Sequence, residues 1–270
     1  MLVAEIGINH NGSMDIAKKL ILQAKAFGWD VVKFQKRTPA LCVPEQFKHV
    51  VKDSIFGPMP YIEYREKIEF GQAEFDEIDK FCKTVGIAWT ASAFDLPSAD
   101  FLKQYALPWI KIPSCAITDL NLLHEIKWPC IISTGMSTAA QIQAAVEIVG
   151  PYLYGIAHCT STYPCPPAEA NLKMIQTLKK LYPGASVGYS GHEIGLPESV
   201  AAIALGADFI ERHVTLDRAM KGGDHAASLE AEGMAKLRKY YDTIRAALGD
   251  GVKRVYDSER GPMEKLRIFN

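Results

Sequence analysis

The 270-residue sequence lacks both an excess of charge and a long apolar run. Its 30 Lys and Arg residues are matched by 31 Asp and Glu residues, so no surplus of positive charge is available to bind nucleic acid or an anionic membrane. Its most apolar long stretch, VAAIALGADFI, is interrupted by Asp208 and is shorter than the roughly 18 apolar residues of a membrane span. The first residues, MLVAEIGINH, have neither the basic flank nor the cleavage site of a signal peptide. We therefore expect a globular protein of the cytoplasm.

Paired cysteine motifs are also missing. No CxxC is present, which disfavours a zinc site built from cysteine. A chain of this length can form a core without disulfides. We expect free thiols at the six cysteines, which are Cys42, Cys82, Cys115, Cys130, Cys159 and Cys165.

What the sequence does contain is a regular alternation of short apolar runs with helical patterns. Helical spacing is clearest in AAQIQAAVEIV, residues 139–149, and similar patterns occupy 14–27, 73–85, 97–105, 168–181 and 195–205. Eight strands alternating with helices predict a single-domain (β/α)8 barrel over residues 1–270. A doubly wound open sheet is the alternative, although no GxGxxG follows the first strand. The expected strands are residues 2–8, 31–35, 87–94, 109–114, 130–135, 153–160, 186–191 and 208–215.

One segment departs from this repeat. Residues 36–72 are long, contain four prolines and carry several aromatic residues. A connection of that length after a barrel strand is usually functional, so we expect a loop that could act as a lid over the site.

Polar residues gather where the expected strands end, which is where barrel enzymes carry their chemistry. Lys33 and Lys111 each interrupt an apolar run, and burying such a charge is costly unless it is paired or used. One interpretation is structural, with each lysine paired to a carboxylate such as Glu5 or Glu211. The other is a functional site that binds an anion through the two lysines and nearby hydroxyls. Those hydroxyls belong to Ser92, Ser114, Ser133 and Ser161.

Two histidines follow adjacent strands. His192 and His213 lie one βα unit apart, and two neutral imidazoles with oxygen ligands suit a divalent transition metal. Asp224 could complete the ligand set, bind a substrate hydroxyl or belong to a turn.

The sequence contains a series of motifs, in order and at the expected strands, namely EIGINHNG, VVKFQ, KIPS, IISTGM, HCTSTYP, VGYSGHEIG, ERHVTLDR and KGGDHAASLE. Taken together, these segments resemble the barrel domain of the sialic acid synthases (N-acetylneuraminate synthases), which condense phosphoenolpyruvate with an N-acetylated sugar. The resemblance spans nearly the whole chain and implies a TIM barrel, a divalent metal (typically Mn²⁺, with Mg²⁺ or Co²⁺ as options) and a homodimer. It implies that His192 and His213 bind the metal and serve catalysis together with Glu5, Lys33 and Lys111. The residues implied for phosphoenolpyruvate are Lys33, Ser92, Lys111, Ser114, Ser133, Ser161 and Ser190, and those implied for an amino sugar such as N-acetylmannosamine are Glu5, Gln35, Tyr163 and Asp224.

The sequence departs from the family pattern in places. Ala116 stands where many members have an acidic residue, which removes an expected sugar contact. Ser92 replaces the usual Thr and keeps its hydroxyl, and Ser161 stands where Asn is common. Family members usually continue into a small antifreeze-like (SAF) domain, whereas this sequence ends at GPMEKLRIFN. We therefore expect a barrel without that domain.

Other functions fit the same residues. A related synthase could use another aldose or a sugar phosphate, and a sugar isomerase could use the metal without phosphoenolpyruvate. A degenerate barrel that only binds a sugar would need none of the catalytic groups, yet both histidines, both lysines and Glu5 are present.

Overall fold

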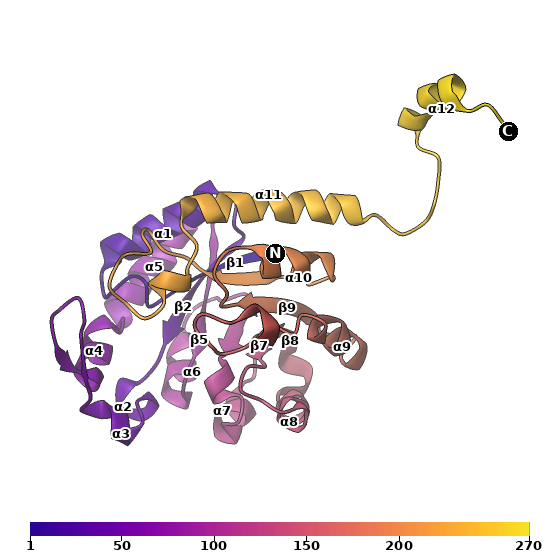
Figure 1. Cartoon of the computed structure of the whole chain (residues 1–270). Helices are drawn as coiled ribbons and strands as arrows, with labels where there is room; N and C mark the ends of the chain where they lie inside the picture. Colours follow the sequence, from indigo (N-terminus) through magenta and orange to yellow (C-terminus); the bar gives the residue numbers. More distant parts are fainter. Residues whose placement is uncertain (270) are drawn as a thin grey trace.

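The computed structural model describes residues 1–269 and contains a closed barrel of eight parallel strands with helices around it (Figure 1). The order around the barrel follows the chain, and the last strand, β10, pairs with the first, β1. This closure confirms the (β/α)8 barrel and excludes the open sheet, and each expected strand boundary lies within two residues of the observed one. The barrel strands are β1 (Leu2–Gly7), β2 (Val31–Lys36), β5 (Ala88–Ala93), β6 (Ile110–Ile112), β7 (Cys130–Ser133), β8 (Leu153–His158), β9 (Ser186–Gly191) and β10 (Ile210–His213).

The helices pack mainly on the outside of this barrel. The six predicted helices are present, but the one expected at 168–181 begins only at Met174, because Asn171 has a positive φ of 41° that a helix cannot continue through. The helix expected at 97–105 ends at Leu102. Outside residues 36–72, three helices were not predicted, namely α7 (Leu120–Glu125), α11 (Ala231–Leu248) and α12 (Arg260–Leu266). The others are α1 (Met14–Ala26), α5 (Gln72–Val85), α6 (Leu96–Leu102), α8 (Ala139–Val149), α9 (Met174–Leu181) and α10 (Pro197–Ala204).

Local sequence signals set several helix ends. The Ser13 hydroxyl accepts a hydrogen bond from the Ile16 amide at the start of α1, and Thr138 with Gln141 forms a reciprocal cap at the start of α8. Gly86 ends α5 in the left-handed region with a φ of 69°. Helix α8 then buries Ile142, as its apolar spacing predicts.

The inside of the barrel is layered. An apolar cluster fills its amino-terminal end, formed by Val3, Val31, Trp109, Ile131, Ala157 and Phe209. Because strand side chains alternate between the two faces, the residue two positions further along each strand also points inward. At those next positions the side chains are mostly polar, namely Glu5, Lys33, Lys111, Ser133, Cys159 and Glu211. The apolar layer is therefore a floor beneath a polar interior at the carboxyl ends of the strands.

The segment after β2 is not the plain loop that we expected at 36–72. It folds into α2 (Pro39–Cys42), α3 (Glu45–Lys48), a hairpin of β3 (Val51–Lys52) and β4 (Met59–Pro60), and α4 (Tyr61–Ile68). We call residues 37–71 the β2–α5 segment. In Figure 1 it stands out from one side of the barrel.

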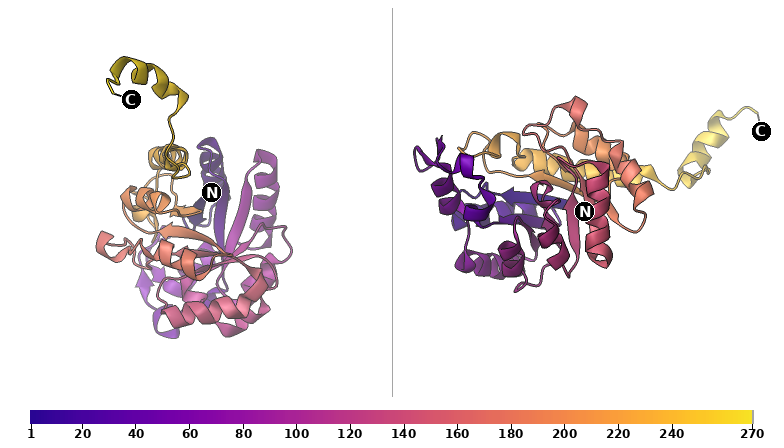
Figure 2. Two further views of the ribbon diagram at one scale, coloured as in Figure 1. Left: turned by 90° about the vertical axis from the view of Figure 1, so that its right-hand side faces the viewer. Right: turned by 90° about the horizontal axis from the view of Figure 1, so that it is seen from below.

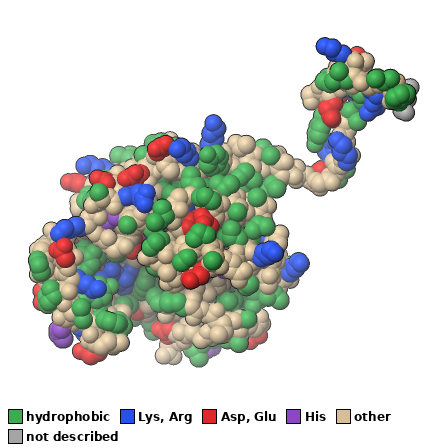
Figure 3. Space-filling view, in the orientation of Figure 1, with side chains coloured by type: hydrophobic (Ala, Val, Ile, Leu, Met, Phe, Trp, Pro, Cys, Tyr) green, Lys and Arg blue, Asp and Glu red, His purple; other side chains and the backbone are tan. Residues whose placement is uncertain are grey.

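The last helix stands apart from the barrel. After α11, the chain runs outward to α12, as Figures 1 and 2 show. Charged side chains of both signs are intermixed on the face seen in Figure 3, in keeping with the balanced composition. Within residues 1–269, no helix combines the length and apolarity required to cross a membrane.

Candidate functional site

A polar cavity of about 270 Å³ lies at the carboxyl ends of the barrel strands. We call it the inner cavity. It brings together all five residues expected to serve catalysis and all seven expected to bind phosphoenolpyruvate, while their individual roles remain predictions. These residues are Glu5, Lys33, Ser92, Lys111, Ser114, Ser133, Ser161, Ser190, His192 and His213.

Both lysines of the inner cavity are held by carboxylates. Lys33 Nζ lies 2.6 Å from Glu5 Oε2 and 3.6 Å from Glu211 Oε1, and it donates to the Ser92 hydroxyl at 2.8 Å. Lys111 Nζ lies 2.6 Å from Glu211 Oε1. Strand register explains part of this arrangement, because Glu5 on β1 is level with Lys33 on β2. The structural interpretation of the lysines was therefore correct about their partners, and the same lysines line the cavity.

Electrostatics keeps Glu211 and Lys33 ionised. Burial alone would raise the pKa of Glu211, but Lys111 and Lys33 outweigh burial and hold that pKa at about 2. Burial also opposes the charge on Lys33, yet Glu211 and Glu5 raise its pKa above the ordinary value. The two lysines thus face two glutamates, so the positive charge of the lysines is offset within the cluster. An entering anion would have to share the lysines with these carboxylates.

The turn after β7 supplies the hydroxyl side of the inner cavity. The Gly135 amide donates to the Ser114 hydroxyl at 3.1 Å. A Cβ atom on Gly135 would lie 2.2 Å from Ser161 Oγ and 2.7 Å from Ser114 Oγ. Only glycine lets the backbone approach these two serines so closely, which places a backbone turn and two hydroxyls around one small space.

The two histidines face each other across a short gap. Their ring centroids are 5.7 Å apart, close enough for both rings to reach one ion through metal–nitrogen bonds of about 2.0–2.1 Å. His192 Nδ1 lies 2.7 Å from the carbonyl oxygen of Thr160. Because a carbonyl can only accept, Nδ1 carries the proton and Nε2 has a free lone pair. Burial, followed by His213, lowers the pKa of His192 to about 3, so this ring is neutral at physiological pH.

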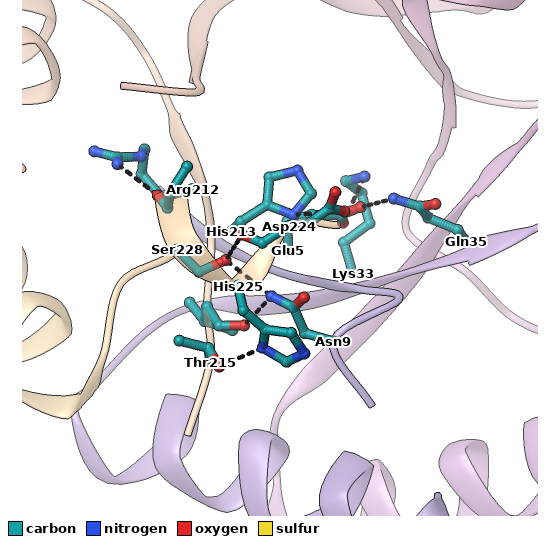
Figure 4. Close-up of polar contacts among 12 residues, drawn as sticks. Glu5, Asn9, Lys33, Gln35, Arg212, His213, Thr215, Asp224, His225 and Ser228 are labelled. Atoms are coloured by element: carbon teal, nitrogen blue, oxygen red, sulfur yellow. Dashed lines mark hydrogen bonds and ion pairs between the residues drawn. The ribbon is translucent and has the colours of Figure 1, made fainter. Parts of the chain in front are cut away.

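Asp224 lies beside the second histidine, as Figure 4 shows. Its Oδ2 is 3.6 Å from His213 Nδ1, a buried nitrogen that has no hydrogen-bond partner. A carboxylate in this position can orient an imidazole and raise its basicity. Within residues 1–269, no group of three or more His, Cys, Asp or Glu side chains is arranged to hold a metal.

A second and larger cavity, of about 690 Å³, adjoins the first. We call it the outer cavity. Among the residues shared by both linings are Gln35, Tyr163 and His213. Of the four residues expected to face the sugar, Gln35, Tyr163 and Asp224 line the outer cavity, whereas Glu5 lies in the inner one and accepts a hydrogen bond from Gln35 Nε2 at 2.7 Å. Much of the outer wall comes from the β2–α5 segment.

Sequence reasoning missed two sets of residues. Arg37 and Arg65 line the outer cavity; Arg37 follows a strand end and could have been found, but Arg65 lies on α4 with no pattern to mark it. Arg212, which precedes His213, and Glu193, which follows His192, form a buried ion pair of 2.7 Å. The sequence signal for that pair was a charged residue next to each histidine, in GHE and ERH.

Comparison with known proteins gives consistent matches. Residues 20–253 match the model of the family described as "NeuB family". The N-acetylneuraminate-9-phosphate synthases of Mus musculus and Homo sapiens are each 37% identical to this chain, over 98% of it and 76% of their own length. The N,N'-diacetyllegionaminic acid synthase of Campylobacter jejuni is 38% identical over 99% of this chain and 83% of its own length. A crystal structure of N-acetylneuraminic acid synthetase from Leptospira borgpetersenii, in complex with citrate, superposes with a TM-score of 0.87 at 31% identity and covers 98% of this chain and 90% of that one.

Proposed function

Because the chain belongs to the NeuB family, we propose that it is a synthase that condenses phosphoenolpyruvate with an N-acylated aldose. The products are a sialic-acid-like 3-deoxy-2-keto sugar acid and inorganic phosphate. The observation that carries the proposal is the pair of adjoining cavities, because one contains two lysines, two histidines and Glu5, and the other is large enough for a sugar.

The reaction needs one C–C bond to form and one C–O bond to break. C3 of phosphoenolpyruvate attacks the aldehyde carbon of the open-chain sugar, and the aldehyde oxygen takes up a proton. Positive character then develops at C2, where water adds and loses a proton. The resulting tetrahedral centre expels phosphate by cleavage of its C2–O bond and leaves the ketone. One phosphate is released for each phosphoenolpyruvate consumed.

The inner cavity offers a group for each charge that appears during the reaction. Lys33 and Lys111 offset the charge of the bound phosphate and of phosphate as it leaves. Their carboxylate partners keep them in position, and the serine hydroxyls with the Gly135 turn add hydrogen bonds to the anion. Glu5 lies between Lys33 and Gln35, where it can transfer protons to and from the reacting oxygen atoms.

We further propose that His192 and His213 bind a divalent metal, most suitably Mn²⁺, with Mg²⁺ and Co²⁺ as options. The free lone pair of His192 and the Asp224 carboxylate beside His213 support this assignment. When bound, such an ion would supply Lewis-acid activation of the aldehyde. His192 and His213 would orient the sugar at the boundary between the two cavities.

The relatives differ in the sugar acid that their names specify. The identity of the acceptor sugar therefore has to be inferred from the residues of this chain. Another aldose or a sugar phosphate is the alternative for the same reaction, and a metal-dependent isomerase is an alternative reaction. Six free cysteines suit a reducing compartment, and we propose the cytoplasm. A homodimer stays a prediction.

The test is a phosphate-release assay with phosphoenolpyruvate, Mn²⁺ and N-acetylmannosamine, followed by detection of the sugar acid. We expect phosphate and sugar acid in equal amounts, loss of both after chelation and recovery with Mn²⁺. If none of the aldoses tested leads to consumption of phosphoenolpyruvate, the synthase is ruled out. Interconversion of sugars without phosphoenolpyruvate would instead identify an isomerase, and sugar binding without any turnover would identify the degenerate barrel.

A further inference from the structure

Arg65 is a buried cation without a partner. Only 4% of its surface is exposed, and its Nη2 atom is buried without a hydrogen-bond acceptor. Among residues 1–269, no carboxylate forms an ion pair with it. Burying a guanidinium costs several kcal/mol unless an anion compensates. A position this expensive indicates that the compensating anion is a ligand.

A second guanidinium lies close to the first. Burial, and after it the neighbouring Arg65, lowers the pKa of Arg37 to about 10. Arg37 Nε is also buried without a hydrogen bond, and Glu69, its nearest carboxylate at 3.8 Å, is closer to Lys36 at 3.2 Å. Two guanidinium groups of like charge thus lie close together away from solvent, and each has a donor nitrogen without a hydrogen bond, namely Arg37 Nε and Arg65 Nη2.

The charge of the whole outer cavity points the same way. Two acidic side chains, Asp53 and Asp224, lie in its lining, and Asp53 is paired with Lys221 at 2.9 Å. The lining therefore has an excess of two positive charges, which matches the charge of a phosphate monoester near pH 7. Its cationic residues are Arg37, Lys52, Arg65 and Lys221.

The position of the arginines fits one end of the acceptor. The sugar aldehyde must meet phosphoenolpyruvate where the cavities join, at Gln35, Tyr163 and His213. The opposite end of the sugar then extends into the outer cavity, toward the wall formed by the β2–α5 segment, which includes Arg65. Gln35 links the two ends, because it donates to Glu5 and accepts a hydrogen bond from Arg37 Nη2.

We propose that Arg37 and Arg65 bind a phosphate monoester on the acceptor sugar, at the carbon furthest from its aldehyde. The acceptor is then an N-acylhexosamine phosphate, and the planar guanidinium forks supply paired hydrogen bonds to its oxygens. The inference rests on the proposed function and adds the charge of the acceptor to it.

The first experiment compares N-acetylmannosamine 6-phosphate with N-acetylmannosamine, at saturating phosphoenolpyruvate and Mn²⁺. We expect kcat/KM to favour the phosphorylated sugar by about 10- to 100-fold, as hydrogen bonds to charged groups provide. Arg65→Met should reduce this preference by a similar factor, chiefly through KM for the phosphorylated sugar, and Arg65→Lys should fall between. Lys67→Met, at an exposed position of the same helix, should leave the preference unchanged.

Three results would overturn the inference. The first is equal use of both sugars by the wild type, and the second is an equal loss for both sugars in Arg65→Met. The third is a preference for the sugar that carries a carboxylate in place of the phosphate. Calorimetry with the sugar phosphate, without phosphoenolpyruvate, separates this inference from the synthase proposal. Binding that depends on Arg65 but gives no turnover refutes only the synthase, whereas turnover without any such dependence refutes only the phosphate site.

Thermal unfolding tests whether Arg65 serves the fold instead. Because Arg65 is buried without an anion, Arg65→Met should raise Tm of the free protein by about 2–4 °C. Added sugar phosphate should stabilise the wild type more than the variant. A lower Tm in Arg65→Met, with no difference in the effect of the ligand, would assign Arg65 to the fold and contradict the inference.

Discussion

The Nζ atom of Lys111 on β6 lies 2.6 Å from Oε1 of Glu211 on β10, although β7, β8 and β9 separate these strands around the barrel. The contact therefore crosses the barrel interior. Glu211 Oε1 is also 3.6 Å from Lys33 on β2, so one carboxylate joins three strands that are distant in sequence. The polar layer of the site is at the same time a brace for the barrel.

Acid should weaken this brace. Lys111 and Lys33 overcome the opposing effect of burial and hold the pKa of Glu211 at about 2, below its ordinary 4.5. A lowered carboxylate pKa stabilises the folded state above pH 4.5, and that stability is lost as the pH falls toward 2. Urea unfolding from pH 7 to 2 should therefore show a steeper loss in the wild type than in Glu211→Gln. The matched control is Glu147→Gln at an exposed position, which should keep the wild-type slope; equal slopes for all three proteins would contradict the prediction.

Removing one histidine should abolish metal binding and turnover together. In His213→Ala the lining of the inner cavity keeps only the imidazole of His192. We expect calorimetry to show at least about a 100-fold loss of Mn²⁺ affinity, with activity reduced in parallel. His124→Ala, on the exposed side of α7, should behave like the wild type. Unchanged Mn²⁺ binding in His213→Ala would refute the ligand assignment.

The turn after β7 should tolerate no side chain. In Gly135→Ala the new Cβ would meet Ser161 Oγ at 2.2 Å and Ser114 Oγ at 2.7 Å, so the serines or the turn must move. We expect KM for phosphoenolpyruvate to rise by about 10-fold or more, because at least one hydrogen bond to a charged group is lost. The comparison is Gly184→Ala, where a Cβ meets nothing within 4 Å and KM should stay the same. A KM for Gly135→Ala within twofold of the wild type would show that the turn does not contact the substrate.

The buried ion pair of Arg212 and Glu193 should matter for stability. Arg212 Nη1 lies 2.7 Å from Glu193 Oε1, and neither side chain is more than 1% exposed. Arg212→Met leaves Glu193 as an uncompensated buried charge, which should lower the free energy of unfolding by about 3–5 kcal/mol. Lys103→Met breaks the exposed pair with Asp100 and should cost no more than about 1 kcal/mol. Similar losses in the two variants, measured by urea unfolding, would contradict the distinction between them.

Much of the fold follows from the sequence because its signals are periodic and local. Apolar runs set the strands, and alternation along them places Glu5, Lys33 and Glu211 above an apolar floor. The strand-end rule therefore predicted the contents of the inner cavity. Helix α11 was missed although its buried residues, Met234, Leu237 and Tyr241, follow helical spacing, so that signal was present.

Other features could not be predicted in this way. The short helices α2 and α3 complete little more than one turn each, so they have no periodic pattern to detect. Arg65 resembles any other charge in a polar stretch until the fold buries it beside Arg37. The sequence offered Glu211 as a partner for a buried lysine, but the path of the Lys111–Glu211 contact across the barrel interior depends on closure, which single strands do not encode. Such contacts become visible only in three dimensions.

The origin of the outer wall bears on how this enzyme class could be diversified. The β2–α5 segment leaves the barrel after Lys36 and returns at α5, and it contributes Arg65 and much of the outer cavity without supplying a residue to the apolar floor. A different segment of similar length could replace it while the eight strands and the inner cavity stay intact. Acceptor preference could then be transferred between proteins. A chimera in which the corresponding segment of a relative replaces residues 37–71 should acquire that relative's choice of sugar.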